Sequence, residues 1–349
     1  MSEKVRVQFY VVDKCGYYND ADAHQFCSFT DVLGQVNNWA RRPTLRLRDL
    51  KTFQCADEFD PPTVYLADLW HDATTGDYLM ATWNEAPNTG GSATSLRGEN
   101  AFGQAVVDST SHPVGNILGY ATYFWLLPSR NLLATIKTES ETAHNGHRGL
   151  CRFISGFLAR FSDHAVASSN VVGPTTLDVA VEGYRQNSAS AVRLLELCFE
   201  SRPARRSGPL NEIRHQRAFI RKIIYRHKLT TSERQSRRMF QKFLVWITGE
   251  RPPELEHTTN FRAEMLFNPT EDQLEHVINR WQQTSINNWN NVGFKLKGNS
   301  AIIWLSGLLV RKTEQLEVER TNGVLDGAAL LTQLIGRRPQ LLALLGETQ

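Results

Sequence analysis

The chain has 349 residues, of which 41% are hydrophobic and 21% are charged, and this is the balance of an ordinary globular protein. No apolar run reaches the roughly eighteen residues of a membrane-spanning helix, and the N-terminus lacks the apolar block of a cleaved leader, so we expect no membrane span. The formal net charge is only +3. The five cysteines are odd in number, scattered and form no CxxC pair, which predicts reduced thiols in a cytoplasmic protein.

The first part of the chain is predicted to be rich in strands. Residues 4–12 alternate apolar and polar side chains, which is typical of a half-buried strand. Residues 30–40 predict a helix that begins at a capping Thr or Asp. Residues 87–115 are rich in Gly, Ser, Asn and Thr and predict an irregular loop. The apolar spacing of residues 149–165 predicts an amphipathic helix, and residues 190–199 predict another strand.

Two pairs of apolar segments with turn residues between them predict β-hairpins. Residues 63–72 and 77–86 flank the turn Ala-Thr-Thr-Gly at 73–76. Residues 117–139 contain the turn Leu-Pro-Ser-Arg at 127–130 between two apolar runs. Both hairpins lie in the strand-rich part of the chain.

Cations are concentrated in one segment of the chain. Residues 202–242 contain thirteen Lys and Arg against two Glu, a formal net of +11, which leaves −8 for the rest of a chain whose total is +3. Ordinary solvated helix faces mix both signs to form pairs three and four residues apart. Such an asymmetry therefore favours a polyanionic partner.

Helical periodicity across this segment predicts two basic helices, over 209–228 and 231–248. Each would have one apolar face for packing and one cationic face for phosphates, which Arg binds with two parallel hydrogen bonds. The predicted nucleic-acid-binding residues are Arg214, Arg217, Arg221, Lys222, Lys228, Arg234, Arg237, Arg238 and Lys242. A stripe of this kind, without a clear recognition-helix pattern, predicts salt-sensitive and largely sequence-independent binding.

Other functions rest on sparser patterns. Arg221 and His227 are spaced like the Arg and His of certain small helical ribonucleases, so a ribonuclease or nuclease toxin is one alternative. His144 and His147 could bind a metal ion, or they could simply belong to a polar turn before the next helix. An acidic protein partner would also suit the basic segment. We find no phosphate-binding Gly loop, dinucleotide fingerprint or zinc signature, and we expect no cofactor.

The remainder predicts a smaller β-α-β-type domain. Residues 261–269 predict a strand and residues 270–284 a helix with a strong N-terminal signal, and further strands follow. Residues 326–346 are apolar and helical, and are expected to close a core or to form a dimer contact. The fold class is therefore α+β, with a strand-rich domain over 1–200, a basic helical segment over 201–252 and an α+β domain over 253–349.

Two parts of the chain resemble a known family. ILGYATYFWLLPSRNLLATIKTE followed by GLCRFISGFLARF looks like the central hairpin and helix of proteins related to the DNA-binding component of the lambda phage Rex exclusion system. FRAEMLFNPTEDQLEHVI followed by NVGFKLKGNSAIIWLSGLLVRKTEQLEV is similar to their final strand-helix-strand unit. The B component of the Kiwa anti-phage system resembles this layout more distantly.

The resemblance implies a non-enzymatic, dimeric binder of double-stranded DNA that acts in phage exclusion with an effector, phage-protein or membrane partner. The resemblance does not assign a role to any particular residue, because it lies in the apolar pattern and in the order of the predicted elements. The residues alone do not indicate whether the bound nucleic acid is DNA or RNA. We therefore expect a nucleic-acid-binding protein, with DNA favoured over RNA by the resemblance.

Overall fold

The structure is a computed structural model of the chain, and it describes residues 2–56, 61–86, 94–108, 115–138, 146–172, 177, 179–205, 208–229, 259–283, 291–298, 302–305 and 309–345. The chain divides into two compact units. Unit 1 contains Met1–Ala204 and Arg311–Ala343, and unit 2 contains Arg205–Val310 and Leu344–Gln349. Each unit is described by itself.

Unit 1 is built on a ten-stranded sheet in which the first strand is the central organiser. The strand β1 (Ser2–Tyr18) pairs along its first half with β8 on one side and β16 on the other, and along its second half with β11. Val5, Val7 and Phe9 are fully buried, so the alternation that predicted this strand is confirmed. The register shifts between Val12 and Lys14, which moves the buried positions by one residue.

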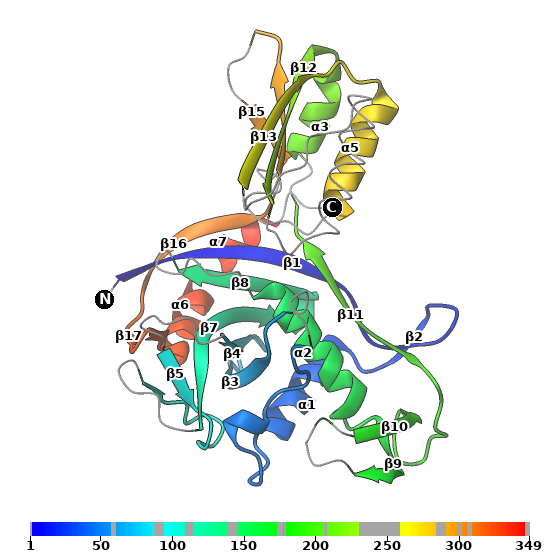
Figure 1. Cartoon of the computed structure of the whole chain (residues 1–349), viewed down its shortest axis with the longest axis vertical. Coiled ribbons are helices and arrows are strands. Elements are labelled where there is room, and N and C mark those ends of the chain that lie inside the picture. The colour runs from blue at the N-terminus through cyan, green and yellow to red at the C-terminus, as the bar shows by residue number, and fades with distance from the viewer. Residues whose placement is uncertain are drawn as a thin grey trace. The chain divides into compact units, whose positions relative to one another are not determined.

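The remaining strands of the sheet follow the order β11-β1-β8-β7-β4-β3, with short strands added at its margins (Figure 1). They are β2 (His24–Phe26), β3 (Val64–His71), β4 (Tyr78–Glu85), β5 (Thr94–Arg97), β6 (Val107–Asp108), β7 (Asn116–Leu127), β8 (Leu132–Thr138), β11 (Glu196–Pro203) and β16 (Arg311–Glu317). Two small ribbons complete the unit, β9 (Ala165–Val172) with β10 (Val179–Tyr184), and β17 (Arg320–Thr321) with β18 (Val324–Leu325).

Helices cover both faces of this sheet. On one face lie α1 (Phe29–Ala40) and α2 (His147–Arg160), which meet through the ring of Trp39. On the other face lie α6 (Gly327–Gly336) and α7 (Arg338–Ala343). Single-turn 3-10 helices occur at η1 (Leu47–Asp49) and η2 (Pro128–Arg130). Leu330, Leu334 and Leu341 are fully buried, so the apolar C-terminal stretch closes a core.

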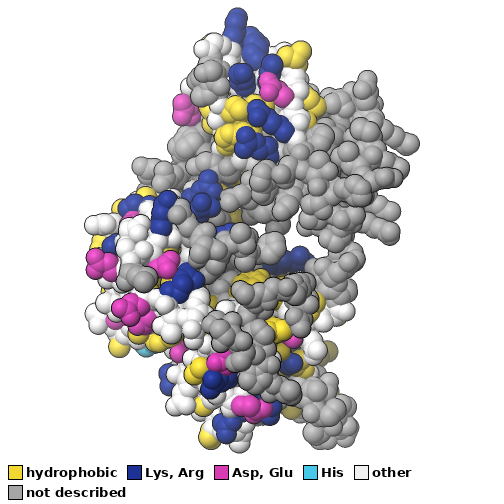
Figure 2. Space-filling model, turned by 60° about the vertical axis from the view of Figure 1, so that its left-hand side comes forward, with side chains coloured by type: hydrophobic (Ala, Val, Ile, Leu, Met, Phe, Trp, Pro, Cys, Tyr) yellow, Lys and Arg dark blue, Asp and Glu magenta, His cyan; other side chains and the backbone are white. Residues whose placement is uncertain are grey.

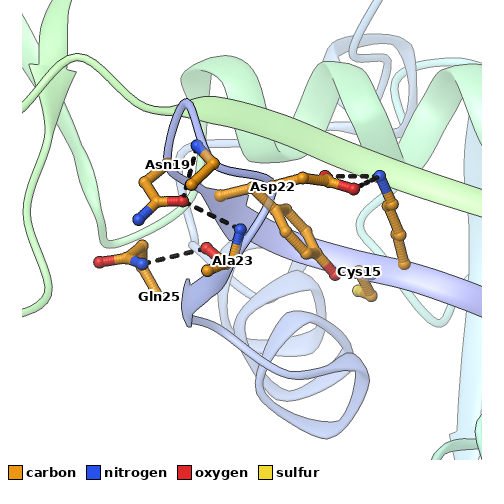
Figure 3. A network of polar contacts seen from close by, with 8 residues as sticks. Cys15, Asn19, Asp22, Ala23 and Gln25 are labelled. Carbon is orange, nitrogen blue, oxygen red and sulfur yellow. Dashed lines mark hydrogen bonds and ion pairs between the residues drawn. The ribbon is translucent and has the colours of Figure 1, made fainter.

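The turn between β1 and β2 is held by side chains (Figure 3). The Asn19 side-chain oxygen accepts hydrogen bonds from the backbone N–H groups of Ala21 and Ala23 at 3.1 and 2.9 Å. Lys14 Nζ contacts both carboxylate oxygens of Asp22, whose φ of 59° lies in the left-handed region that Asp tolerates better than most residues. The chain is thereby turned so that β2 pairs antiparallel with β1.

Unit 2 is a four-stranded antiparallel sheet with two helices on one face. The strand order is β13-β12-β14-β15, formed by β12 (Ile220–Leu229), β13 (Thr259–Leu266), β14 (Asn291–Leu296) and β15 (Ile302–Trp304). The helices α3 (Gly208–His215) and α5 (Glu271–Gln283) lie on the same side of it (Figure 1), and the 3-10 turn η3 (Arg217–Phe219) leads into β12. One apolar core joins both helices to the sheet.

The α+β class with a strand-rich N-terminal region is confirmed, and so are both predicted hairpins. The helix at 30–40 is present, but Ser28 caps it, in a reciprocal arrangement with Asp31. The irregular loop predicted over 87–115 contains β5 and β6. The strand predicted over 190–199 begins only at Glu196.

The observed division differs from the three predicted segments. Residues 311–343 belong to unit 1, because β16 pairs with β1 from Ser2↔Glu317 to Gln8↔Arg311. The basic segment has no unit of its own, since α3 and β12 are parts of unit 2. The boundary predicted after residue 252 therefore does not divide the units, and unit 2 continues to Val310.

Candidate nucleic-acid interface

The predicted basic helix over 209–228 is wrong beyond its first two turns. The helix α3 ends at His215, and the residues from Ile220 onward form β12. Ile223 and Ile224 are adjacent, β-branched and both fully buried. A helix with one apolar face would not bury both so completely, whereas neighbouring residues of a strand point to opposite faces. The sequence folds here as a strand, in which Ile223 packs into the core with the helices and Ile224 is buried on the opposite side of the sheet.

Because this segment is a strand, Arg221 and His227 do not have the spacing on a helix on which the ribonuclease alternative depended. Arg221 and His227 are six residues apart on one strand, which separates their backbones by about 20 Å. Two groups that share one phosphate must lie within hydrogen-bond reach of it. The pair therefore does not form the predicted ribonuclease site.

The predicted cationic stripes are not tested as a whole, because half of them lies outside the described residues. Arg234, Arg237, Arg238 and Lys242, with the helix predicted over 231–248, fall in the range 230–258, which the structure does not describe. Lys228 belongs to β12, opposite Asn260, but its side chain is also outside the described set. Arg214, Arg217, Arg221 and Lys228 do not form the helical stripe that was predicted, because α3 ends before Arg217.

Several of the described cations have partners within unit 2. Arg214 forms a two-pronged ion pair with Glu275 of α5, with N···O distances of 2.5 and 2.9 Å. The hydrogen bond raises the pKa of Arg214 and lowers the pKa of Glu275. Arg217 donates to the Pro269 carbonyl and Arg221 to the Asn268 side chain. Arg214 thus joins α3 to α5, and Arg217 and Arg221 bind the segment that leads from β13 into α5.

Four other described cations of unit 2, Lys222, Arg226, Arg262 and Lys295, lie on the sheet face opposite α3 and α5, which we call the outer face. Along β12, Ile223 and Tyr225 pack into the core with the helices, so Lys222, Ile224 and Arg226 point the other way. Strand register extends this face across the sheet. The side chains on it that are at least partly exposed are Lys222, Arg226, Arg262, Glu264, Leu266, Lys295, Ile302 and Trp304, whereas Ile224 and Asn291 on the same face are buried.

The outer face is strongly positive. Among its described side chains there are four cations and one carboxylate, a formal net of +3. The carboxylate, Glu264, accepts a hydrogen bond from Lys222 at 2.9 Å, and this bond together with Lys222, Lys295 and Arg262 as neighbouring charges lowers its pKa. Figure 2 brings this face forward and shows Lys and Arg side chains around a hydrophobic patch.

A stacked pair of side chains lies within the same face. Arg226 is held over the ring of Trp304, with its Cζ atom 4.3 Å from the ring centroid. The neighbouring position on β14 is Gly293, where a Cβ atom would lie 2.8 Å from Cε3 of Trp304 and 2.6 Å from Cγ2 of Ile302. Only glycine leaves room for these side chains to lie flat over the sheet. The pair restricts the guanidinium before any ligand arrives.

Four residues of this face are not among the predicted binding residues: Arg226, Arg262, Lys295 and Trp304. The sequence holds a signal for them, because it predicts a strand over 261–269 and further strands after the helix that follows. In FRAEMLF, charged and apolar residues alternate, which places Arg262 and Glu264 on one face and Ala263 and Met265 on the other. Combining this period of two with charge would have identified the outer face.

The metal-site alternative is not supported by the surroundings of His147. His144 lies outside the described residues. His147 begins α2, its ring stacks on Tyr10 with centroids 3.9 Å apart, and its Nε2 atom lies 2.9 Å from Ser201 Oγ and 3.7 Å from Cys151 Sγ. Within the described ranges, no three His, Cys, Asp or Glu side chains gather as a metal site. His147 is thus a packing residue of unit 1.

The buried imidazole gives a testable pH dependence. Burial lowers the pKa of His147 from 6.5 to about 4. Between these two pH values the unfolded state binds more protons than the folded state, so stability falls as the pH is lowered from 6.5 to 4, by up to about 3 kcal/mol. We expect urea unfolding to show a shallower pH dependence for His147→Gln than for the natural chain. Equal dependence in both chains would contradict this assignment.

Two exposed arginines of unit 1, Arg152 and Arg160, line a cavity and do not belong to the outer face. A cavity of about 350 Å³ lies beside α2, with Thr52, Phe53, Arg152 and Arg160 among its lining residues. The guanidinium of Arg152 lies over the Phe53 ring, 6.0 Å from its centroid. In the part of the chain that is described, neither arginine has a carboxylate within ion-pair distance. These two residues serve below as charge-matched controls.

No helix within the described residues is long and apolar enough to cross a membrane. Comparisons with protein-family models, with curated proteins and with solved structures found no match to this chain.

Proposed function

We propose that this chain is a nucleic-acid-binding protein that contacts phosphates with the outer face of unit 2. The observation that carries the proposal is the charge of this face, whose described residues include four cations, Lys222, Arg226, Arg262 and Lys295, and one carboxylate, Glu264. Phosphate contacts by Lys and Arg release counterions, and this supplies most of the affinity in binding that is independent of sequence.

An acidic protein is the competing partner, and the composition of the face argues against it. A purely electrostatic site for a protein carboxylate needs only cations, whereas this face sets an Arg–Trp pair and exposed apolar side chains among them. Aromatic rings and guanidinium planes interleaved with cations are typical of surfaces that contact nucleotides.

The proposal is tested by binding measurements on the full chain with labelled DNA and RNA between about 50 and 300 mM salt. We expect binding without cleavage, with or without divalent metal, and a linear fall of log K with log salt of slope about −3, as four phosphate contacts predict. No binding at the lowest salt, or a tight protein complex that excess DNA does not compete, would overturn the proposal.

A role in phage exclusion and a dimeric state, both implied by the resemblance, stay predictions. They are compatible with the proposed site but do not rest on it. A plaque assay with the outer-face variants described below would connect nucleic-acid binding to such a role.

A further inference from the structure

We propose that the outer face takes a single-stranded nucleic acid in preference to a duplex, with an unstacked base placed against the Arg226–Trp304 pair. This inference rests on the proposed function and names the form of nucleic acid that the same site would select. It is carried by the width of the sheet, by its apolar side chains and by the stacked pair.

The width of the sheet does not suit the grooves of a duplex. Four strands span three inter-strand spacings, about 14 Å between the outer backbones. The major groove of B-form DNA is about 12 Å wide and admits one helix or a two-stranded ribbon. The outer face therefore meets a duplex only at its sugar-phosphate exterior, and it does not reach the base edges.

The apolar side chains of the face favour exposed bases. Leu266 is 79% exposed, and Ile302 and Trp304 are partly exposed. The exterior of a duplex presents charged phosphates, against which such side chains gain little. The bases of a single strand are accessible and lie against apolar and aromatic surfaces.

The Arg226–Trp304 pair places a guanidinium over an aromatic ring beside the cations of the outer face, between β12 and the edge strand β15. Its guanidinium is already stacked on the indole, with Cζ 4.3 Å from the ring centroid, so little conformational freedom is lost when a ligand binds. Arg planes and aromatic rings both stack on bases of any sequence, while flanking cations contact the backbone. Lys222 and Lys295 are opposite each other on β12 and β14 and provide those backbone contacts.

The experiment compares one labelled oligonucleotide of about 16 nucleotides as a single strand and as a duplex, at equal salt, by fluorescence anisotropy. We expect the natural 349-residue chain to bind the single strand at least about tenfold more tightly than the duplex. Trp304→Ala should weaken single-strand binding by about tenfold or more and change duplex binding less than about twofold. Trp304→Phe keeps a ring and should retain most of the single-strand affinity.

The outcomes separate this inference from the proposed function. Equal or tighter binding of the duplex by the natural chain overturns the single-strand preference and leaves phosphate binding in place. An equal loss for both forms in Trp304→Ala, with normal circular dichroism, overturns the role of the stacked pair. No binding of either form overturns the proposed function and this inference with it.

Discussion

Reversing two charges of the outer face, by Arg262→Glu together with Lys295→Glu, is expected to remove most of the affinity for nucleic acid. The formal net charge of the described face changes from +3 to −1, because two cations become two carboxylates. Loss of two phosphate contacts alone predicts a fall of roughly 30-fold near 0.1 M salt and a salt slope smaller by about 1.5, and repulsion adds to the fall. Anisotropy titrations across a salt series measure both quantities.

The matched control is Arg152→Glu together with Arg160→Glu, which makes the same change in total charge on unit 1. Both arginines are exposed, as Arg262 is, so neither double variant is expected to disturb a core. We expect the control to change affinity by less than about threefold, since neither arginine is part of the outer face that is proposed to contact the phosphates. Similar losses in the two double variants would assign binding to net charge and not to the outer face.

A third variant tests whether removing a negative charge from the outer face raises the affinity for nucleic acid. Glu264→Gln removes the one carboxylate of the described face and releases Lys222 from its hydrogen bond at 2.9 Å. Because its neighbours keep the pKa of Glu264 low, the side chain is charged at neutral pH and opposes phosphate binding. Affinity should therefore rise, by a few-fold. A loss of affinity would mean that Glu264 positions Lys222 and that the face works as a fixed network.

The local patterns of the sequence predicted many elements of unit 1, though not β5 and β6, and they did not predict how the elements are arranged. Turn residues at 73–76 and 127–130 identified both hairpins, because Gly76 adopts a positive φ that other residues avoid and Pro128 fixes its own φ. The pairing of β1 with β16 joins residues about three hundred positions apart, and no local pattern specifies such a partner. The assignment of residues 311–343 to unit 1 follows from this pairing and could not be predicted.

The helix predicted over 209–228 was wrong for a different reason. Its cations recur at spacings that suit both a helix and a strand, and tertiary contacts decided between them at Ile223 and Ile224, which are both buried. Carboxylates are nearly absent from the segment, but Glu264 and Glu275 reach it from later parts of the chain. The cluster of cations in the sequence thus identified unit 2 as positively charged. It did not show that Arg214 and Lys222 form ion pairs with carboxylates from later in the chain.

The largest expected change in stability comes from Arg338→Leu. Asp77, just before β4, has no solvent exposure, and Arg338 of α7 donates to its two oxygens at 2.8 and 3.3 Å. Trp125 Nε1 donates to the same carboxylate at 3.2 Å. Without Arg338 the carboxylate stays buried and unpaired, so we expect a loss of about 3–5 kcal/mol in the free energy of unfolding, measured by urea unfolding with tryptophan fluorescence.

Two comparisons make the prediction specific. Arg202→Leu breaks the ion pair of Arg202 with Asp13, whose side chains are 57% and 36% exposed, and should cost less than about 1 kcal/mol. Asp77→Asn combined with Arg338→Leu leaves a neutral amide that still accepts from Trp125, so the double variant should be more stable than Arg338→Leu alone. Equal stability of the single and double variants would show that the buried charge is not the cause. The C-terminal helices would then be held to the sheet by apolar packing around Leu334 and Leu341 and not by the pair with Asp77.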